Sequence, residues 1–228
     1  MGFEFRRFKE ISKEEFSQYH QENQRVMESK DDIYFLILHQ SNQTDRSNHH
    51  ELFCSVGIKL AHSNSFEIKL RIKRKKSGIE QWKKFHGTLQ QPLNLQHLDR
   101  KTLLDGVVKL LNDQTQYQSY FTDDPNKYTI LPVYVKKIRK TSYCYEHAFF
   151  SLRFDEPQGN NLSDKEWYFE SVNIEGYKKK KQIPKDLLNR HFSEQQDSDA
   201  SAQILTMGYP ELIYTWWYRN NSVGTTDE

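Results

Sequence analysis

The sequence predicts an α+β fold, namely a mainly antiparallel closed β-barrel with a charged lumen that is covered on the outside by helices. Several predicted strands have one apolar face and one charged face, and helix signals stand between groups of strands. A closed barrel would gather the charged faces in its interior and leave the apolar faces for the helices to cover. The 228 residues suffice for one such domain, so we expect it to span residues 1–218, with a disordered tail over 219–228.

The strongest strand pattern is FEIKLRIKRK, residues 66–75. With a period of two, Glu67, Lys69, Arg71 and Lys73 lie on one face, and the other face is apolar. Three cations beside one acid suit an anion, although lysine is also common on solvated strands. The segment IEQWKKFHG should return as the antiparallel partner, and its register leaves open whether Lys83 or Lys84 faces the lumen.

The N-terminus shows the same design on a shorter strand. Residues 2–8 place Phe3 and Phe5 on one side and Glu4 and Arg6 on the other. The S-x-x-E capping box that begins at Ser12 then predicts a helix to about residue 28, with Ile11 and Phe16 in position for a hydrophobic staple.

Four further segments precede the second half of the sheet. Residues 32–39 read as a buried strand, 51–60 as another strand, and the polar residues between them as a loop. His49 and His50 fall in that loop, and a solvated pair explains them better than a metal site. Asp99 should cap a helix with a broad apolar stripe.

The second half of the sheet also carries charges. On the strand 128–143, Lys137 and Arg139 share a face, and on 148–155 Arg153 and Asp155 share one. The next strand has Glu170 on one face and Glu175 on the other. The lysines at 178–181 read as a solvated turn before a helix over 184–192, and the apolar residues of 202–219 should dock a C-terminal segment on the body.

Composition limits the class of protein. The net charge is only +2, so any basic site must be local and the chain is not built to coat nucleic acid. Cys54 and Cys144 form neither a CxxC motif nor a Cys/His cluster, which favours a reducing compartment. No apolar run approaches the roughly 18 residues of a membrane span. We therefore expect a cytoplasmic protein without a membrane partner.

The predicted lumen suits a polyphosphate. Guanidinium groups clamp phosphate oxygens bidentately, and carboxylates can hold a divalent cation that bridges phosphates and a water. The sequence contains no Ser-His-Asp set, P-loop or HExxH motif that would indicate another class of hydrolase.

The order of these motifs resembles the CYTH domain of the triphosphate tunnel metalloenzymes. The similarity covers an opening strand, the basic strand IKLRIKRK with its W-K-K return, a linking helix, VKKIRK, SLRFD and the acidic strand YFES, roughly from Phe3 to Glu175. Where that family opens with E-x-E-x-K, this chain has Gly2, Glu4 and Arg6, and Glu170 is followed two residues later by Val172 instead of a second acid.

The resemblance implies residue roles position by position. A triphosphatase would hold Mg²⁺ or Mn²⁺, which would position the attacking water, with Glu4, Asp155 and Glu170 as catalytic and metal-binding residues. The implied substrate-binding residues are basic: Arg6, Lys69, Arg71, Lys73, Lys137, Arg139 and Arg153.

Three functional hypotheses follow. The first is a metal-dependent hydrolase of an inorganic or small organic triphosphate. The second, motivated by the acids missing at Gly2 and Val172, is a catalytically inactive module of the same fold that binds a phosphorylated ligand or protein partner. The third is a single-stranded RNA-binding barrel, although the aromatic residues fall mainly on apolar strand faces. We expect no nucleic-acid partner other than the 5′-triphosphate end of an RNA.

Overall fold

A computed structural model describes residues 2–23, 27–39, 54–62, 64–89, 100–112, 128–142, 145–155, 165–177 and 204–221. The predicted loop at 40–50 and the predicted helix over 184–192 lie outside these residues, as do His49, His50 and Lys178 to Lys181. Within them, no helix is long and apolar enough to cross a membrane.

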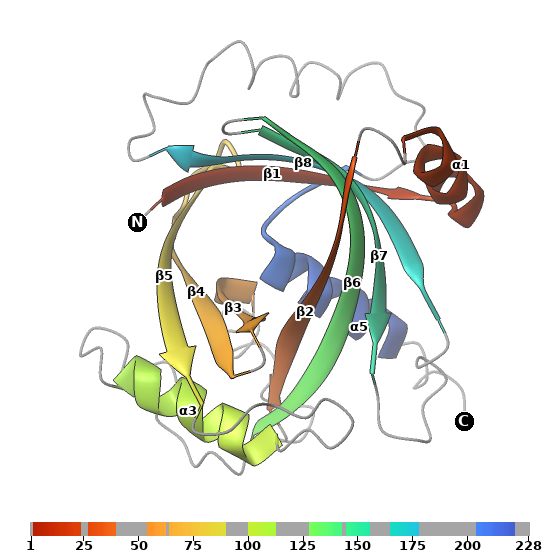
Figure 1. The fold of residues 1–228 in the computed structure, drawn as a ribbon. Helices are drawn as coiled ribbons and strands as arrows, with labels where there is room; N and C mark the ends of the chain where they lie inside the picture. Colours follow the sequence, from red (N-terminus) through yellow and green to blue (C-terminus); the bar gives the residue numbers. More distant parts are fainter. Residues whose placement is uncertain are drawn as a thin grey trace, which may run out of the picture.

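Eight antiparallel strands close into a barrel, as predicted (Figure 1). They are β1 (Gly2–Ile11), β2 (Glu28–His39), β3 (Val56–His62), β4 (Ser65–Arg74), β5 (Glu80–Thr88), β6 (Tyr128–Ser142), β7 (Tyr145–Phe154) and β8 (Trp167–Tyr177). The order β5-β4-β3-β2-β6-β7-β8-β1 is closed by pairing of β1 with β5, from Gly2↔Trp82 to Glu4↔Glu80. The short β9 (Ile204–Thr206) pairs with β1 beyond that point.

Local sequence signals account for most element boundaries. The β4–β5 hairpin turns at Gly78, whose φ of +71° favours glycine. The predicted capping box is present: the Ser12 amide donates to Glu15, and the Glu15 amide donates to the Ser12 hydroxyl. Several boundaries are corrected. The first helix ends at Asn23, not near residue 28, and β2 begins at Glu28, not at Asp32. Cys54 and Ser55 are helical, so β3 begins only at Val56.

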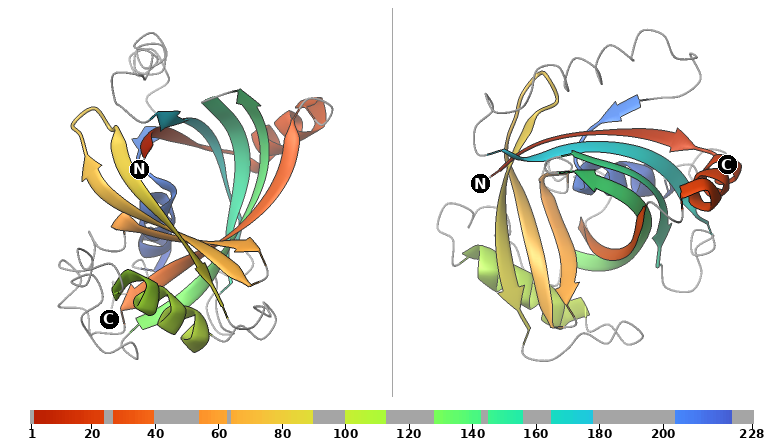
Figure 2. Two further views of the ribbon diagram at one scale, coloured as in Figure 1. Left: turned by 60° about the vertical axis from the view of Figure 1, so that its left-hand side comes forward. Right: turned by 45° about the horizontal axis from the view of Figure 1, so that its top comes forward.

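Among the helices in the described part of the chain, two cover the outside of the barrel (Figure 2). Helix α1 (Lys13–Asn23) lies against β7 and β8, where Tyr19 stacks on Phe149 at 4.1 Å between ring centroids. Helix α3 (Arg100–Asn112) packs its Leu103, Leu104 and Val107 into the same core as Phe66 and the other outward apolar residues of β4. The prediction that helices cover outward apolar faces is confirmed here.

Helix α5 (Tyr209–Asn221) packs instead on inward-facing side chains of the barrel. Tyr209 contacts the rings of Phe8 and Phe150, and Trp216 packs edge-on against Phe169. Gly57 on β3 permits this approach, because a Cβ there would lie only 2.6 Å from Pro210 Cγ. The interior is therefore divided between an apolar core around α5 and a polar pocket.

Candidate functional site

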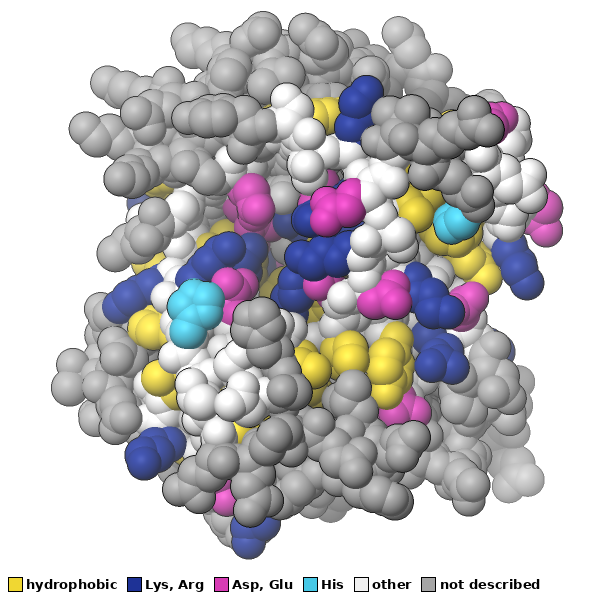
Figure 3. Space-filling model, viewed as in Figure 1, with side chains coloured by type: hydrophobic (Ala, Val, Ile, Leu, Met, Phe, Trp, Pro, Cys, Tyr) yellow, Lys and Arg dark blue, Asp and Glu magenta, His cyan; other side chains and the backbone are white. Residues whose placement is uncertain are grey.

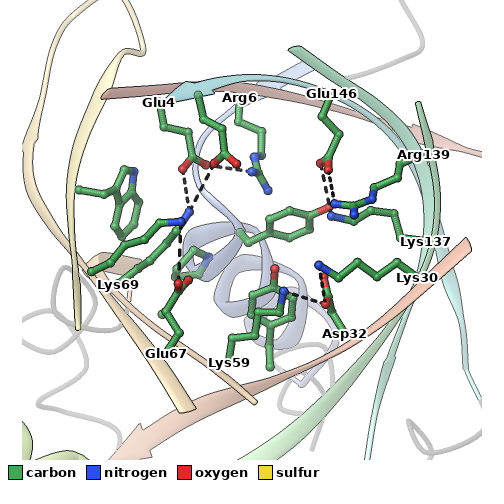
Figure 4. A pocket seen from close by; sticks show the side chains of 17 residues that line it. Glu4, Arg6, Lys30, Asp32, Lys59, Glu67, Lys69, Lys137, Arg139 and Glu146 are labelled. Carbon is green, nitrogen blue, oxygen red and sulfur yellow. Dashed lines mark hydrogen bonds and ion pairs between the residues drawn. The ribbon is translucent and has the colours of Figure 1, made fainter. Parts of the chain in front are cut away.

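The polar half of the barrel holds a pocket of about 270 Å³ to which all eight strands of the ring contribute. Figure 3 shows charged side chains gathered at a hollow in the centre of this face, and Figure 4 shows them pointing toward one another across the lumen. The lining is completed by Tyr34, Gly57, Trp82, Tyr209 and Pro210. Seven cations and five carboxylates face the cavity: Arg6, Lys30, Lys59, Lys69, Lys84, Lys137 and Arg139, with Glu4, Asp32, Glu67, Glu146 and Glu175.

Half of the predicted site residues lie in this pocket. They are Glu4 and Arg6 on β1, Lys69 on β4, and Lys137 and Arg139 on β6. Lys84 lines the pocket and Lys83 does not, which answers the question that the β5 sequence left open. The prediction that charges from separate strands converge in one interior space holds for these residues.

Arg71 and Lys73 follow Lys69 on β4 but do not line the pocket. Arg71 donates to Glu80 on β5 and to Glu211 on α5, at 2.9 and 2.6 Å, so its guanidinium is already committed to carboxylates of the protein. A β-bulge between Arg71 and Lys73 then shifts the register, and Lys73 is exposed.

Arg153, Asp155 and Glu170 also lie away from the pocket, and the face assigned to β7 and β8 from sequence is corrected. Phe149, which pairs with Glu170, packs against α1 outside the barrel. Arg153 is exposed and lies over the Tyr134 ring, and Tyr134 donates to Asp155 at 3.4 Å. The predicted metal set Glu4, Asp155 and Glu170 is therefore not brought together.

Glu4 is a buried carboxylate of the pocket that faces two cations. Its Oε1 lies 3.1 Å from Arg6 Nη2 and its Oε2 lies 2.9 Å from Lys69 Nζ, so each oxygen faces a cation. Burial opposes the charged form, but the two cations outweigh it and lower the pKa of Glu4 to about 2. Glu4 is thus ionised at all ordinary pH values.

Arg6 is held between Glu4 and the floor of the pocket. Its guanidinium carbon lies 4.2 Å from the centroid of the Tyr209 ring, in cation–π geometry. Only 6% of the side chain is exposed, and its Nε has no hydrogen-bond partner among the described residues. A buried guanidinium donor without an acceptor is a feature that an anionic ligand would satisfy.

A second ion network occupies the opposite wall. Glu146 on β7 accepts from Lys137 at 3.4 Å and from Arg139 at 3.1 Å. Burial raises the pKa of Glu146, but Lys137 and Arg6 outweigh that effect and lower it. Arg139 also donates to Glu28 at the end of β2, which fixes the guanidinium at the rim.

The third network is on β2 and β3, where sequence analysis assigned no site residue. Asp32 lies 2.7 Å from Lys59 and 3.6 Å from Lys30. Burial raises the pKa of Asp32, but the hydrogen bond from Lys59 and the charges around it lower it overall. Lys30, Asp32 and Tyr34 alternate along β2, and that spacing was the available signal.

Glu146 and Glu175 were also missed. Glu175 pairs directly with Glu4 across β1 and β8, whereas Glu170 is on the other face of β8. Glu170 was chosen because the resemblance to the CYTH domain placed the closing acidic motif there. No sequence signal singles out Tyr209, because its position depends on α5 entering the barrel.

The donor set does not fit a divalent metal held by protein carboxylates. Among the described residues, no group of three or more His, Cys, Asp or Glu is placed to hold a metal ion. Glu4 and Glu175 are neighbours, but the Lys69 ammonium lies within ion-pair distance of both. Hard divalent cations need several free oxygen ligands, and here both oxygens of Glu4 and one oxygen of Glu175 already face cations.

Comparisons of the sequence with protein-family models and with curated proteins find no match. Solved structures with a similar fold include a candidate adenylyl cyclase from Hippeastrum reported to have a dominant triphosphatase activity, at 9% identity and a TM-score of 0.46, covering 95% of this chain and 96% of that one.

A second is a candidate adenylate cyclase from Bacillus halodurans, at 14% identity and a TM-score of 0.43, covering 86% of this chain and 89% of that one. A third is the PH1819 protein of Pyrococcus horikoshii OT3, at 14% identity and a TM-score of 0.42, covering 95% of this chain and 99% of that one. At these scores the likenesses leave the function of this chain open. From its own strand pairing, the fold is the closed antiparallel tunnel that the resemblance to the CYTH domain implied.

Proposed function

We propose that this protein is a divergent CYTH-type module that binds a small triphosphate or inorganic polyphosphate in the lumen of its barrel. The observation that carries the proposal is the convergence of seven cations from six strands on one pocket with only five carboxylates. Cations held in a partly buried space attract a compact, highly charged anion more strongly than the same charges would on an open surface.

The positions of individual cations support a phosphate chain as the ligand. Arg6 and Lys137 are almost fully buried, with 6% and 4% of their side chains exposed, and their charged groups lie 4.2 and 4.8 Å from the centroid of the Tyr209 ring. Lys59, Lys69 and Arg139 are 20–24% exposed and lie around them. A linear polyanion can therefore contact buried cations at one end and more accessible cations along its length.

Binding is favoured over hydrolysis by the donor set described above. The resemblance to the tunnel enzymes implied a metal-positioned water, but of the three acids expected to hold the metal only Glu4 is in the pocket. We therefore assign the protein the role of a phosphate-binding module and treat triphosphatase activity as the alternative to be tested.

The test is calorimetric titration of the full chain with tripolyphosphate, ATP, pyrophosphate and phosphate. Tripolyphosphate should bind most tightly, and Arg6→Met and Lys137→Met should each weaken it roughly tenfold or more, because a hydrogen bond to a charged group contributes about 1.5–3 kcal/mol. Lys73→Met is the matched control, since Lys73 is an exposed basic residue outside the pocket.

Two results would change the proposal. Equal affinity of wild type, Arg6→Met and Lys137→Met for tripolyphosphate would exclude the lumen as the binding site. Release of phosphate from tripolyphosphate or ATP in the presence of Mg²⁺ or Mn²⁺, lost in Glu4→Gln, would replace the binding module with the metal-dependent hydrolase.

A further inference from the structure

Lys69 occupies an unusual position between two carboxylates. Glu4 on β1 and Glu175 on β8 are directly paired across neighbouring strands, and both side chains line the pocket. The Lys69 ammonium reaches them from β4, on the far side of β5, and its Nζ lies 2.9 Å from Glu4 Oε2 and 3.8 Å from Glu175 Oε2 (Figure 4). The pair of acids thus has a cation of the protein between its members.

The neighbouring Arg6 extends this arrangement. Its Nη2 lies 3.1 Å from the other oxygen of Glu4, so Lys69 and Arg6 together place two positive charges beside two negative ones. The two positive charges of Lys69 and Arg6 equal the charge that one divalent metal ion would bring to a pair of carboxylates. The ammonium has three N–H donors and the guanidinium five, so after pairing with the acids both retain donors for a ligand.

The environment keeps Lys69 charged. Burial opposes protonation, but the charges of Glu4 and Glu175 outweigh it and raise the pKa of Lys69. A neutral amine at this position would leave two acids facing each other in a partly buried space, which is unfavourable. Together with Arg6, the three groups therefore form a neutralised unit within the pocket.

We propose that the Lys69 ammonium takes the place of a divalent metal between Glu4 and Glu175, so that the pocket binds its polyphosphate ligand without Mg²⁺ or Mn²⁺. This inference rests on the proposed function of the same pocket. Phosphate oxygens would contact Lys69 and Arg6 directly, where a metal-dependent site would interpose an ion.

The first experiment measures Mn²⁺ binding to the full chain by electron paramagnetic resonance, without any phosphate ligand. Wild type should leave Mn²⁺ free in solution, whereas Lys69→Gln, which keeps a polar side chain but removes the charge, should bind Mn²⁺ at least tenfold more tightly than wild type. Lys84→Gln is the matched control, because Lys84 lines the same pocket but faces Glu67, at 3.8 Å.

The second experiment titrates tripolyphosphate into wild type in EDTA and, separately, with excess Mn²⁺. The inference predicts that binding in EDTA is no weaker than binding with Mn²⁺. Binding that requires the metal would overturn it while leaving the polyphosphate-binding function intact, and no binding in either buffer would remove the proposed function itself. Two further results would overturn the inference. One is that wild type binds Mn²⁺ and Glu4→Gln does not. The other is that Lys69→Gln folds but gains no affinity for Mn²⁺.

Discussion

The stability of the barrel should contain an acid-sensitive contribution from Glu4, and the replacement Glu4→Gln isolates it. Only 7% of this side chain is exposed, and both of its oxygens face cations. Glutamine has nearly the same shape but cannot ionise. The difference in unfolding free energy between wild type and the variant therefore reports the charged form of Glu4.

The size and sign of the effect follow from the pKa of Glu4. It is about 2 in the fold against an ordinary value of 4.5, and at 1.36 kcal/mol for each pH unit this difference corresponds to about 3 kcal/mol. Because the pKa of Glu4 is lower in the folded protein than in the unfolded chain, the contribution to stability is fully present above pH 4.5. It is lost as the pH falls from 4.5 to about 2.

The assay is urea unfolding of both proteins between about pH 7 and about pH 2.5. The unfolding free energy of wild type exceeds that of Glu4→Gln at neutral pH, and this difference should shrink by most of the roughly 3 kcal/mol as the pH is lowered. Glu67→Gln is the control, since Glu67 lies 3.8 Å from a half-exposed Lys84 and such pairs contribute at most about 1 kcal/mol. A wild-type advantage that stays constant with pH would refute the view that Arg6 and Lys69 stabilise an ionised Glu4.

Three further changes test other contacts of the fold by urea unfolding. Arg71→Met should destabilise the protein by about 1.5–3 kcal/mol, because it removes a charged hydrogen bond to the buried carboxylate of Glu80, which then keeps only Trp82 and the more distant Arg74. Adding Glu80→Gln should restore part of the loss. Gly57→Ala should lower the unfolding free energy by about 1–3 kcal/mol, because the added methyl group would meet Pro210. A urea midpoint equal to that of wild type would show that α5 is not held against β3. Ser12→Ala should cost about 1 kcal/mol through loss of the α1 cap, whereas Ser12→Asp should retain the stability.

Much of the barrel could be predicted because its signals are local. The capping box at Ser12, the alternation of residues 66–75 and the turn that returns as β5 depend on neighbours along the chain, and all are present. Glu4, Arg6 and Lys69 were placed correctly for the same reason. On β1 and β4 only one face carries charges near the pocket, so the alternation alone decides which face turns inward.

The face of β7 could not be decided in this way. Both of its faces are apolar and buried over most of its length, with Phe149 packed on α1 and Phe150 against α5. The inward face was therefore assigned from the charged residues alone, which selected the face of Arg153. That residue is exposed outside the barrel. The inward charge on this strand is Glu146, near its beginning, because the middle of the inward face packs on a helix from the other end of the sequence.

The carboxylates of the pocket limit what it can bind. Every cation that sequence analysis placed there correctly is paired with an acid of the protein, from Arg6 with Glu4 to Arg139 with Glu146. A ligand must compete with these acids, while the acids hold the cations in fixed positions before the ligand arrives. A single phosphate offers too little charge to compete at several cations at once, whereas a chain of phosphates contacts many of them together. The same pairing that lowers affinity for small anions therefore gives the pocket its preference for long ones.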